Sequence, residues 1–303
     1  MDGRPPYGNR KAGPVRRPRP YLRNMKRLAA GLVGVVLLFA SAACGAPAPH
    51  AVSHVSAPSS TYPVGVRVLA LSRGKARPLP TTVWYPALLA GRDTPIAAGR
   101  FPVVIYSHGL HSLPEYHAQI VTRWAAAGFV VAAPAYPRTR EGTRRFSRAD
   151  VRNQPADAWY VVRKVLTLPA FAGHLDGSRV GAAGHSAGGY TTAGLFTAGH
   201  DRGLRGGIVI AGAGMAGAFA GPRAAILFVH GTADPTVPIE AARAAYARIS
   251  WPKSFLALPG QDHGAYLTPG QPGFAEVLAT TLDFLRWILY DDQTAHARLA
   301  LVT

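Results

Sequence analysis

The feature that most restricts the fold of this chain is a series of short apolar segments without a polar face. A strand with one face in water alternates polar and apolar residues, whereas consecutive apolar residues are typical of parallel strands that helices cover on both sides. Segments with helical spacing separate these runs, and the alternation predicts an α/β fold. The predicted strands are Val64–Ser72, Thr81–Tyr85, Val103–Tyr106, Phe129–Ala133, Val180–Ala183, Ile208–Ile210, Ala225–Val229 and Phe255–Leu258.

The segments between the strands have the spacing of amphipathic helices. The clearest is Phe274–Tyr290, where apolar residues from Val277 to Ile288 fall on one face. With 48% hydrophobic and 16% charged residues, the chain can fill one large core. We therefore expect one α/β domain at residues 62–303, with a mostly parallel eight-stranded sheet and helices on both faces. The other predicted helices lie at residues 115–127, at Ala156–Leu168, from about Ala187, and at Glu240–Ile249.

Residues 1–44 have the composition of a basic leader and signal peptide. Residues 1–27 carry nine Arg and Lys against one Asp, and the apolar run Leu28–Ala43 follows them. This run is shorter than the ~20 residues that a membrane span needs, and the pattern is typical of a secretory signal. We expect export to the bacterial cell envelope. A true start at Met25 is one interpretation of the long basic segment, and a genuine long leader is the other.

Cys44 is the only cysteine, so no intramolecular disulfide can form. The stretch from Ser41 to Cys44 resembles the lipobox of bacterial lipoproteins, in which cleavage leaves a lipidated cysteine at the new N-terminus. That family usually has Leu where Ser41 stands. We favour lipidation of Cys44 over plain cleavage and free secretion. The small, proline-rich residues 45–61 then form a flexible tether.

The net charge of +18 does not by itself indicate a nucleic-acid partner. Removing residues 1–44 takes away nine positive charges and one negative charge, which leaves 24 − 14 = +10. The remaining sequence has no Arg- or Lys-rich helix with interleaved aromatic residues, and an exported protein rarely meets DNA. We expect no nucleic-acid partner.

The segment Gly184-His185-Ser186-Ala187-Gly188 matches the pattern G-x-S-x-G and lies between a predicted strand and a predicted helix. A sharp turn there would hold Ser186 in a strained backbone conformation, and larger residues at 184 or 188 would collide across it. The hydroxyl would then lie at the carboxyl end of the sheet, beside a helix N-terminus that favours a developing oxyanion. Ser186 is therefore the predicted nucleophile. The alternative is a glycine-rich turn that contains a small serine.

A serine hydroxyl is a weak nucleophile unless a base accepts its proton. His263 follows the last predicted strand and Asp234 follows the strand Ala225–Val229, so both fall at the carboxyl end of the sheet. The chain order Ser, Asp, His is the order that this architecture uses, and the three residues form a predicted catalytic triad. Asp262 is the competing acid, ranked lower because a residue adjacent to a histidine seldom points at its ring.

The backbone N–H groups of Leu110 and Ala187 are the predicted oxyanion donors, because one follows the strand Val103–Tyr106 and the other begins a helix. His108 is expected to brace the first of these loops rather than act as a second base. We expect no metal and no cofactor. The tentative substrate-binding residues are His111, Tyr136, Met215, Val237 and Tyr266.

The chain resembles serine hydrolases of the α/β-hydrolase superfamily from Tyr62 to about Tyr290. It is most similar to the branch that includes bacterial polyester hydrolases, platelet-activating-factor acetylhydrolase-like enzymes and dienelactone-hydrolase-like proteins. The resemblance implies the α/β-hydrolase fold and hydrolysis of carboxylic esters without a metal or organic cofactor. It is carried, in order, by YPVGVRVLALS, TTVWYPA, PVVIYSHGL, GFVVAAPAYP, GHSAGG, HGTADPTVP and DHGAY.

Three departures from this branch narrow what the resemblance implies. Polyester hydrolases usually have Met where Ala187 stands and a Trp after the next strand, whereas residues 211–221 contain no large aromatic residue except Phe219. Dienelactone hydrolases use Cys where Ser186 stands. Polyester cleavage is therefore in doubt, while ester hydrolysis is not. Residues 211–221 are also too short and small to form a helical lid, so we expect an open cleft.

The function expected from these residues is that of an exported, monomeric serine ester hydrolase that forms an acyl-enzyme with a small-molecule or lipid ester. An acyltransferase with the same triad is the first alternative, because an acceptor alcohol can replace water in the second step. A non-catalytic binding protein on a hydrolase scaffold is the second. It would be expected to have lost a triad residue, and none is missing.

A basic run follows the strand Phe129–Ala133 and leaves the sheet at the end that holds Ser186. One acidic residue, Glu141, offsets it. It is either a solvated loop or a rim that attracts anionic esters or holds the protein against an acidic surface. Its arginines are Arg138, Arg140, Arg144, Arg145 and Arg148.

Overall fold

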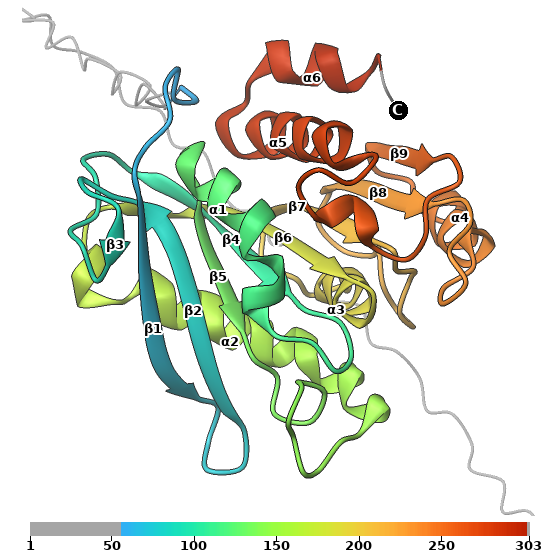
Figure 1. The fold of residues 1–303 in the computed structure, drawn as a ribbon, viewed down its shortest axis with the longest axis horizontal. Coiled ribbons are helices and arrows are strands. Elements are labelled where there is room, and N and C mark those ends of the chain that lie inside the picture. The colour runs from blue at the N-terminus through green and yellow to red at the C-terminus, as the bar shows by residue number, and fades with distance from the viewer. Residues whose placement is uncertain (1–55, 302–303) are drawn as a thin grey trace, which may run out of the picture. The chain divides into compact units, whose positions relative to one another are not determined.

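The computed structural model describes residues 56–301, and within them a mixed nine-stranded sheet carries helices on both faces (Figure 1). The strand order across the sheet is β3-β1-β2-β5-β4-β6-β7-β8-β9. The strands are β1 (Val64–Ser72), β2 (Pro78–Pro86), β3 (Gly91–Arg92), β4 (Phe101–Ser107), β5 (Val130–Pro134), β6 (Leu175–His185), β7 (Leu204–Ile210), β8 (Ala225–Gly231) and β9 (Lys253–Leu258).

The helices include four short 3₁₀ segments as well as longer α-helices. The α-helices are α1 (Ala118–Ala126), α2 (Gln154–Leu166), α3 (Ala187–Leu195), α4 (Ile239–Ala247), α5 (Phe274–Tyr290) and α6 (Gln293–Leu299). The 3₁₀ segments are η1 (Pro114–His117), η2 (Arg148–Asn153), η3 (Pro169–Phe171) and η4 (Ala265–Leu267).

Strand direction brings the ends of several strands to one edge of the sheet. β2 is antiparallel to β1 and β5, whereas each neighbouring pair from β5 to β9 is parallel. The last residue of β4, Ser107, pairs with Gly184 of β6, and Gly231 of β8 pairs with Leu258 of β9. The loops that leave these four strands therefore begin at the same edge, which is where ligands bind in sheets of this kind.

Successive side chains of the central strands enter two separate cores. Val103 and Ile105 of β4 pack in the core under α2, α3 and α4, while Val104 and Tyr106 pack in the core under α1 and α5. Each of these four side chains is essentially inaccessible to water. Full burial of one such side chain contributes about 2 kcal/mol, so a strand covered on both faces has no position at which a polar residue is favoured.

The predicted α/β class and the mostly parallel sheet are confirmed, and α5 has the predicted bounds. The predicted number of eight strands is wrong, because the two residues of β3 pair with β1 and are too few to show periodicity. β6 begins at Leu175, five residues before the predicted start at Val180. The residues around Asp176 are polar, so no apolar run marks this part of the strand, and its pairing with β4 is irregular there. Helix α6 was also not predicted.

The predictions for residues 1–44, including Cys44, lie outside the described residues. Of the predicted tether only residues 56–61 are described, and the carbonyl oxygen of Pro58 accepts a hydrogen bond from Arg286 of α5. The backbone of Tyr62 bonds to Ala126 at the end of α1. In residues 56–301 we find no helix with the length and apolar character that crossing a bilayer requires.

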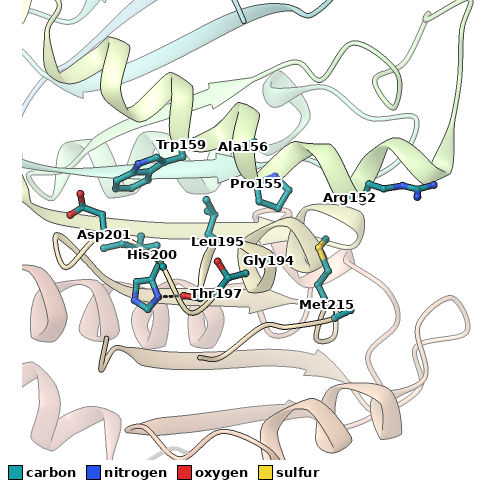
Figure 2. A pocket seen from close by; sticks show the side chains of 13 residues that line it. Arg152, Pro155, Ala156, Trp159, Gly194, Leu195, Thr197, His200, Asp201 and Met215 are labelled. Atoms are coloured by element: carbon teal, nitrogen blue, oxygen red, sulfur yellow. Dashed lines mark hydrogen bonds between the residues drawn. The ribbon is translucent and has the colours of Figure 1, made fainter. Parts of the chain in front are cut away.

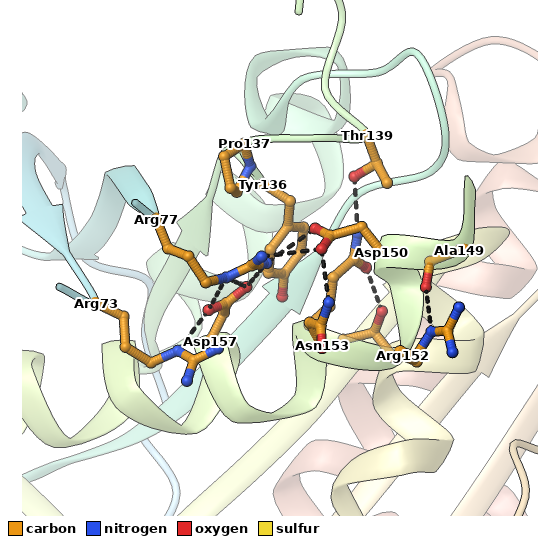
Figure 3. A network of polar contacts seen from close by, with 12 residues as sticks. Arg73, Arg77, Tyr136, Pro137, Thr139, Ala149, Asp150, Arg152, Asn153 and Asp157 are labelled. Atoms are coloured by element: carbon orange, nitrogen blue, oxygen red, sulfur yellow. Dashed lines mark hydrogen bonds and ion pairs between the residues drawn. The ribbon is translucent and has the colours of Figure 1, made fainter. Parts of the chain in front are cut away.

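A buried ion-pair network fixes η2 and α2 against the hairpin of β1 and β2 (Figure 3). Arg77 beside that hairpin donates hydrogen bonds to Asp150 of η2 and Asp157 of α2, and Arg73 donates to Asp157 at 2.7 Å. Burial alone would raise the pKa of Asp150, but the hydrogen bonds from Arg77 and Asn153 outweigh it and lower that pKa below its ordinary value. The network therefore holds η2 in place through charge.

Replacing Asp157 with Ala should lower the free energy of unfolding by about 3 kcal/mol, because it leaves the guanidinium of Arg77 with one partner in a mostly buried position. The Asp157 side chain is 0% exposed and that of Arg77 is 15% exposed. Urea denaturation measures the difference. The control is Asp283→Ala, which removes a pair with the 49% exposed Arg298 and should cost under about 1 kcal/mol. Equal losses in both variants would contradict the buried network.

Candidate active site

Ser186 lies in the turn between β6 and α3, with φ 57° and ψ −120°. A serine rarely adopts this conformation, which costs about 1–3 kcal/mol unless the surroundings impose it. Its N–H bonds to the carbonyl oxygen of Ile210 at 2.9 Å. A Cβ at Gly184 would overlap the backbone of Gly188, and a Cβ at Gly188 would overlap the carbonyl group of Ser107. The expected need for glycine on both sides of the turn is therefore confirmed.

Three side chains from separate loops meet at this turn. His263, from the loop after β9, has Nε2 at 2.8 Å from Oγ of Ser186 and Nδ1 at 2.8 Å from Oδ2 of Asp234. A carboxylate can only accept, so Nδ1 carries the proton and Nε2 accepts the hydroxyl of Ser186. The structure brings together the three residues that the sequence assigned to a triad. The arrangement can transfer a proton from the serine to the imidazole.

Asp234 is held as an ionised acceptor in the loop after β8. Its Oδ1 accepts the backbone N–H groups of Thr236 and Val237 at 2.8 and 2.9 Å. Burial by itself would raise the pKa of this carboxyl, but the hydrogen bonds from His263 and from these two amides lower it below its usual value. The charge opposite the imidazole is therefore retained in a side chain that solvent does not reach.

Asp262, the competing acid, bonds to the backbone of its own loop and does not contact the ring of His263. Its Oδ1 accepts the backbone N–H groups of Gly264 and Ala265 at 3.0 and 2.9 Å, and these bonds lower the pKa of its carboxyl. Asp262 thus shapes the loop that carries His263, and it is Asp234 that contacts the imidazole.

Two further histidines, His108 and His185, position the loops of the site. His185 donates from Nε2 to the carbonyl oxygen of His263 at 2.6 Å, and the two rings lie 4.8 Å apart. His108 donates from Nδ1 to Gly109 and accepts the N–H of Tyr136 at Nε2. His108 therefore braces its loop, as expected, while His185 fixes the loop of the base. The available sequence signal for His185 is its position next to Ser186, as the last residue of β6.

The N–H of Leu110 donates to no acceptor within the described residues, and that of Ala187 lies in the first turn of α3, where N–H groups have no helical partner. Both residues line the same cleft as Ser186. The two amides are therefore available to a negatively charged oxygen formed beside the serine.

The cleft around Ser186 has a volume of about 300 Å³. Within residues 56–301, no helix lies in the segment 211–221, for which the sequence predicts no lid. Phe219 of that segment is buried against Phe228 and is not a wall of the cleft. The residues that line the cleft are Leu110, Arg148, Val151, Ser186, Ala187, Tyr190, Thr236 and Val237.

Of the five tentative substrate-binding residues, only Val237 lines this cleft. Tyr136 is buried beneath the loop after β4, where its hydroxyl contacts that of Ser107 at 2.8 Å. Tyr266 is fully buried in the core under α1 and α5. His111 is exposed and stacks on Phe146 at 4.0 Å. These three predictions are corrected, because position near a strand end does not determine which way a side chain points.

Met215, the fifth tentative residue, lines a second cavity of about 570 Å³ between α2 and the end of α3 (Figure 2). Its Sδ lies over Gly194, where an added Cβ would come within 2.7 Å of it. Trp159 of α2 and His200 line the same cavity, and Ser186 does not. The expected contact of Met215 with a substrate beside Ser186 is therefore not observed.

Three cleft residues, Tyr190, Thr236 and Val151, were not identified from the sequence. Tyr190 stands four residues after Ser186, so both fall on one face of α3, and this spacing was the available signal. Thr236 adjoins Asp234 in the same loop. Val151 comes from η2, whose approach to α3 depends on tertiary packing and has no local sequence signature. Arg148, also of η2, belongs to the basic run that the sequence places at this end of the sheet, and it is the residue of that run that lines the cleft.

Two buried histidines and the half-buried His185 near the site should make stability depend on pH. Burial lowers the pKa of His108 and His185 to about 4 and that of His117 to about 3, compared with 6.5 in an unfolded chain. Their contribution is complete above about pH 6.5 and is lost as pH falls toward 4, because the unfolded chain binds protons that the folded chain excludes. Each should add about 1.4 kcal/mol per pH unit to the slope near pH 5.

Chemical denaturation between pH 4.5 and 7 measures this slope, with His117→Phe as the comparison. The variant should lower the slope near pH 5 by about 1.4 kcal/mol per pH unit. An unchanged slope would mean that His117 is protonated in the folded protein.

Comparisons with known proteins agree with this architecture. The chain is similar to the chlorophyllase family, whose model matches residues 83–213, a range that includes Leu110 and Ser186 but ends before Asp234 and His263. A ferulic acid esterase from Streptomyces cinnamoneus has a similar structure, with a TM-score of 0.56 and 21% identity over 78% of this chain and 90% of that one. Comparison with curated proteins gives no significant match. With its sheet order and its serine turn, this chain has the α/β-hydrolase fold of that esterase.

Proposed function

We propose that this protein is a serine hydrolase of carboxylic esters that uses Ser186, His263 and Asp234 as its catalytic triad. The observation that carries the proposal is the continuous hydrogen-bond chain from Oγ of Ser186 through His263 to Asp234, with both distances at 2.8 Å. The matching family and the structural neighbour support ester hydrolysis, since the neighbour is named an esterase. The open, largely apolar cleft is suited to a small-molecule or lipid ester.

The proposed reaction has two halves that use the same groups. Oγ of Ser186 attacks the ester carbonyl carbon while Nε2 of His263 takes the hydroxyl proton, and the carbonyl oxygen becomes an anion held by the Leu110 and Ala187 amides. The C–O bond to the alcohol breaks as the imidazolium gives its proton to the leaving oxygen. Water then attacks the acyl-enzyme by the same route, releasing the acid and restoring Ser186. Asp234 stabilises the imidazolium in both halves.

Replacing Ser186 or His263 with Ala should lower kcat/KM for 4-nitrophenyl acetate by at least about 10³-fold, because the proton relay is lost. Asp234→Asn should cost roughly 10³–10⁴-fold, since an amide favours the wrong tautomer of His263. A fluorophosphonate probe should not label Ser186→Ala, because the reacting hydroxyl is absent. It should label the His263 and Asp234 variants slowly, because they keep that hydroxyl. The measurements are steady-state rates and the mass of the labelled chain.

Asp262→Asn is the matched control, because it changes a carboxylate adjacent to His263 that does not contact the imidazole. It should lower kcat/KM by less than about tenfold, as expected for a loop residue. A loss as large as that of Asp234→Asn would reverse the assignment of the acid. Full activity of Ser186→Ala would remove the proposed mechanism altogether.

We also propose that the protein is exported and anchored by a lipid on Cys44. The basis is the sequence of residues 1–44, with its basic segment, apolar run and lipobox-like end. Buried acyl methylenes contribute about 0.8 kcal/mol each, so two or more chains on one cysteine would hold the domain at a membrane surface. The part of the predicted tether that precedes Pro58 would then link the lipid to the folded domain.

Cys44→Ala should move the protein from the membrane fraction to the soluble fraction of a bacterial host, because the residue that carries the lipid is removed. Immunoblots of fractionated cells measure the change, and the activity of the released protein shows that it folds. Retention of Cys44→Ala in the membrane fraction would contradict lipidation.

A further inference from the structure

Arg148, an exposed arginine, contributes to the lining of the cleft that holds the proposed nucleophile. Arg148 is the first residue of η2 and lines the cleft together with Ser186, Leu110 and Tyr190. Within the described residues it is the only charged side chain among those that line this cleft. The remaining lining is apolar or carries hydroxyl groups, so nothing in it neutralises an arginine.

The guanidinium of Arg148 has no partner in the described part of the chain, where it forms no hydrogen bond and no ion pair. Other arginines nearby are used internally, since Arg77 and Arg73 bond to Asp150 and Asp157. Glu141, the acidic residue of the basic run, accepts the hydroxyl of Tyr116. The charge on Arg148 is therefore available to a ligand.

The segment that carries Arg148 is held in place next to α3. Asp150 pairs with Arg77, as Figure 3 shows, and the amide nitrogen of the buried Gln154 donates to Thr139 at 2.7 Å. The side-chain oxygen of Gln154 accepts the hydroxyl of Thr191 of α3. These bonds begin two residues after Arg148, so its backbone is positioned against α3, the helix that follows Ser186.

We propose that Arg148 selects esters that carry a carboxylate close to the scissile bond. This inference rests on the proposed esterase function and adds the substrate class. A guanidinium donates two parallel N–H bonds to a carboxylate, and such charged bonds are stronger than neutral ones. Arg138, Arg144 and Arg145 line a different hollow together with Pro78 and Pro137, so they contribute only a long-range positive potential.

The test compares esters that differ only in a carboxylate. On the acyl side the pair is the 4-nitrophenyl hemiester of glutaric acid and 4-nitrophenyl pentanoate, with spontaneous hydrolysis subtracted. On the alcohol side the pair is 4-carboxyphenyl acetate and phenyl acetate. The quantity measured is the ratio of kcat/KM for the charged ester to that for the neutral ester, at pH 7.5 and low salt.

In Arg148→Gln the ratio should fall about three- to tenfold for at least one of the two pairs, the range expected for a partly solvated ion pair. Arg148→Lys should recover part of it, and Arg148→Glu should lower it further than Arg148→Gln. The matched control is Arg144→Gln, which removes the same charge from the same run outside the cleft. Its ratio should stay within about twofold of that of the unaltered protein.

Salt separates a direct pair from long-range attraction. In 0.5 M NaCl the effect of Arg144→Gln should disappear, because charges more than about 5 Å apart are then screened, while part of the Arg148→Gln effect should remain. Unchanged ratios for both pairs in Arg148→Gln, or equal losses in Arg148→Gln and Arg144→Gln, would overturn the proposal. Absence of hydrolysis of all four esters by the unaltered protein would instead overturn the esterase function.

Discussion

The close approach of α3 to the end of β4 is the contact on which the candidate site depends. At Gly184 and Gly188 the backbones come so near that no Cβ fits, and Ser186 between them is held at positive φ. This packing points the hydroxyl out at the edge of the sheet where the loops after β8 and β9 also begin. The strain at one residue is therefore imposed by the contact of three elements.

Electrostatics around the serine follow from how each group is partnered. Asp234 keeps its charge because two amides and an imidazole bond to it in a site without solvent. His108 is buried and His185 is half-buried, and loss of water around their rings lowers the pKa of each to about 4, so they serve as neutral hydrogen-bonding groups. One histidine, His263, lies between a carboxylate and a hydroxyl. The three histidines have the same side chain, but their burial and hydrogen-bond partners make His263 the proton acceptor and leave His185 and His108 to position loops.

The arginines of the molecule show the same principle. Arg77 forms ion pairs with two buried carboxylates, those of Asp150 and Asp157, and so fixes η2 and α2 to the hairpin of β1 and β2. That fixation in turn positions Arg148, whose side chain is unpaired within the described residues and lines the cleft. The ion pairs of Arg77 therefore hold the segment η2 in the position from which Arg148 can make the proposed contact with substrate.

The sequence by itself determined the fold class, the turn at Ser186, and the positions along the chain at which Asp234 and His263 follow strands. These features are local, because apolar runs and glycine spacing act over a few residues. Only the tertiary structure decided which side chains line the cleft. It placed Tyr136 and Tyr266 in the interior and Met215 in a second cavity, and it brought Val151 and Arg148 to the serine. The direction of a side chain at a strand end depends on packing between elements far apart in sequence, and no local pattern encodes it.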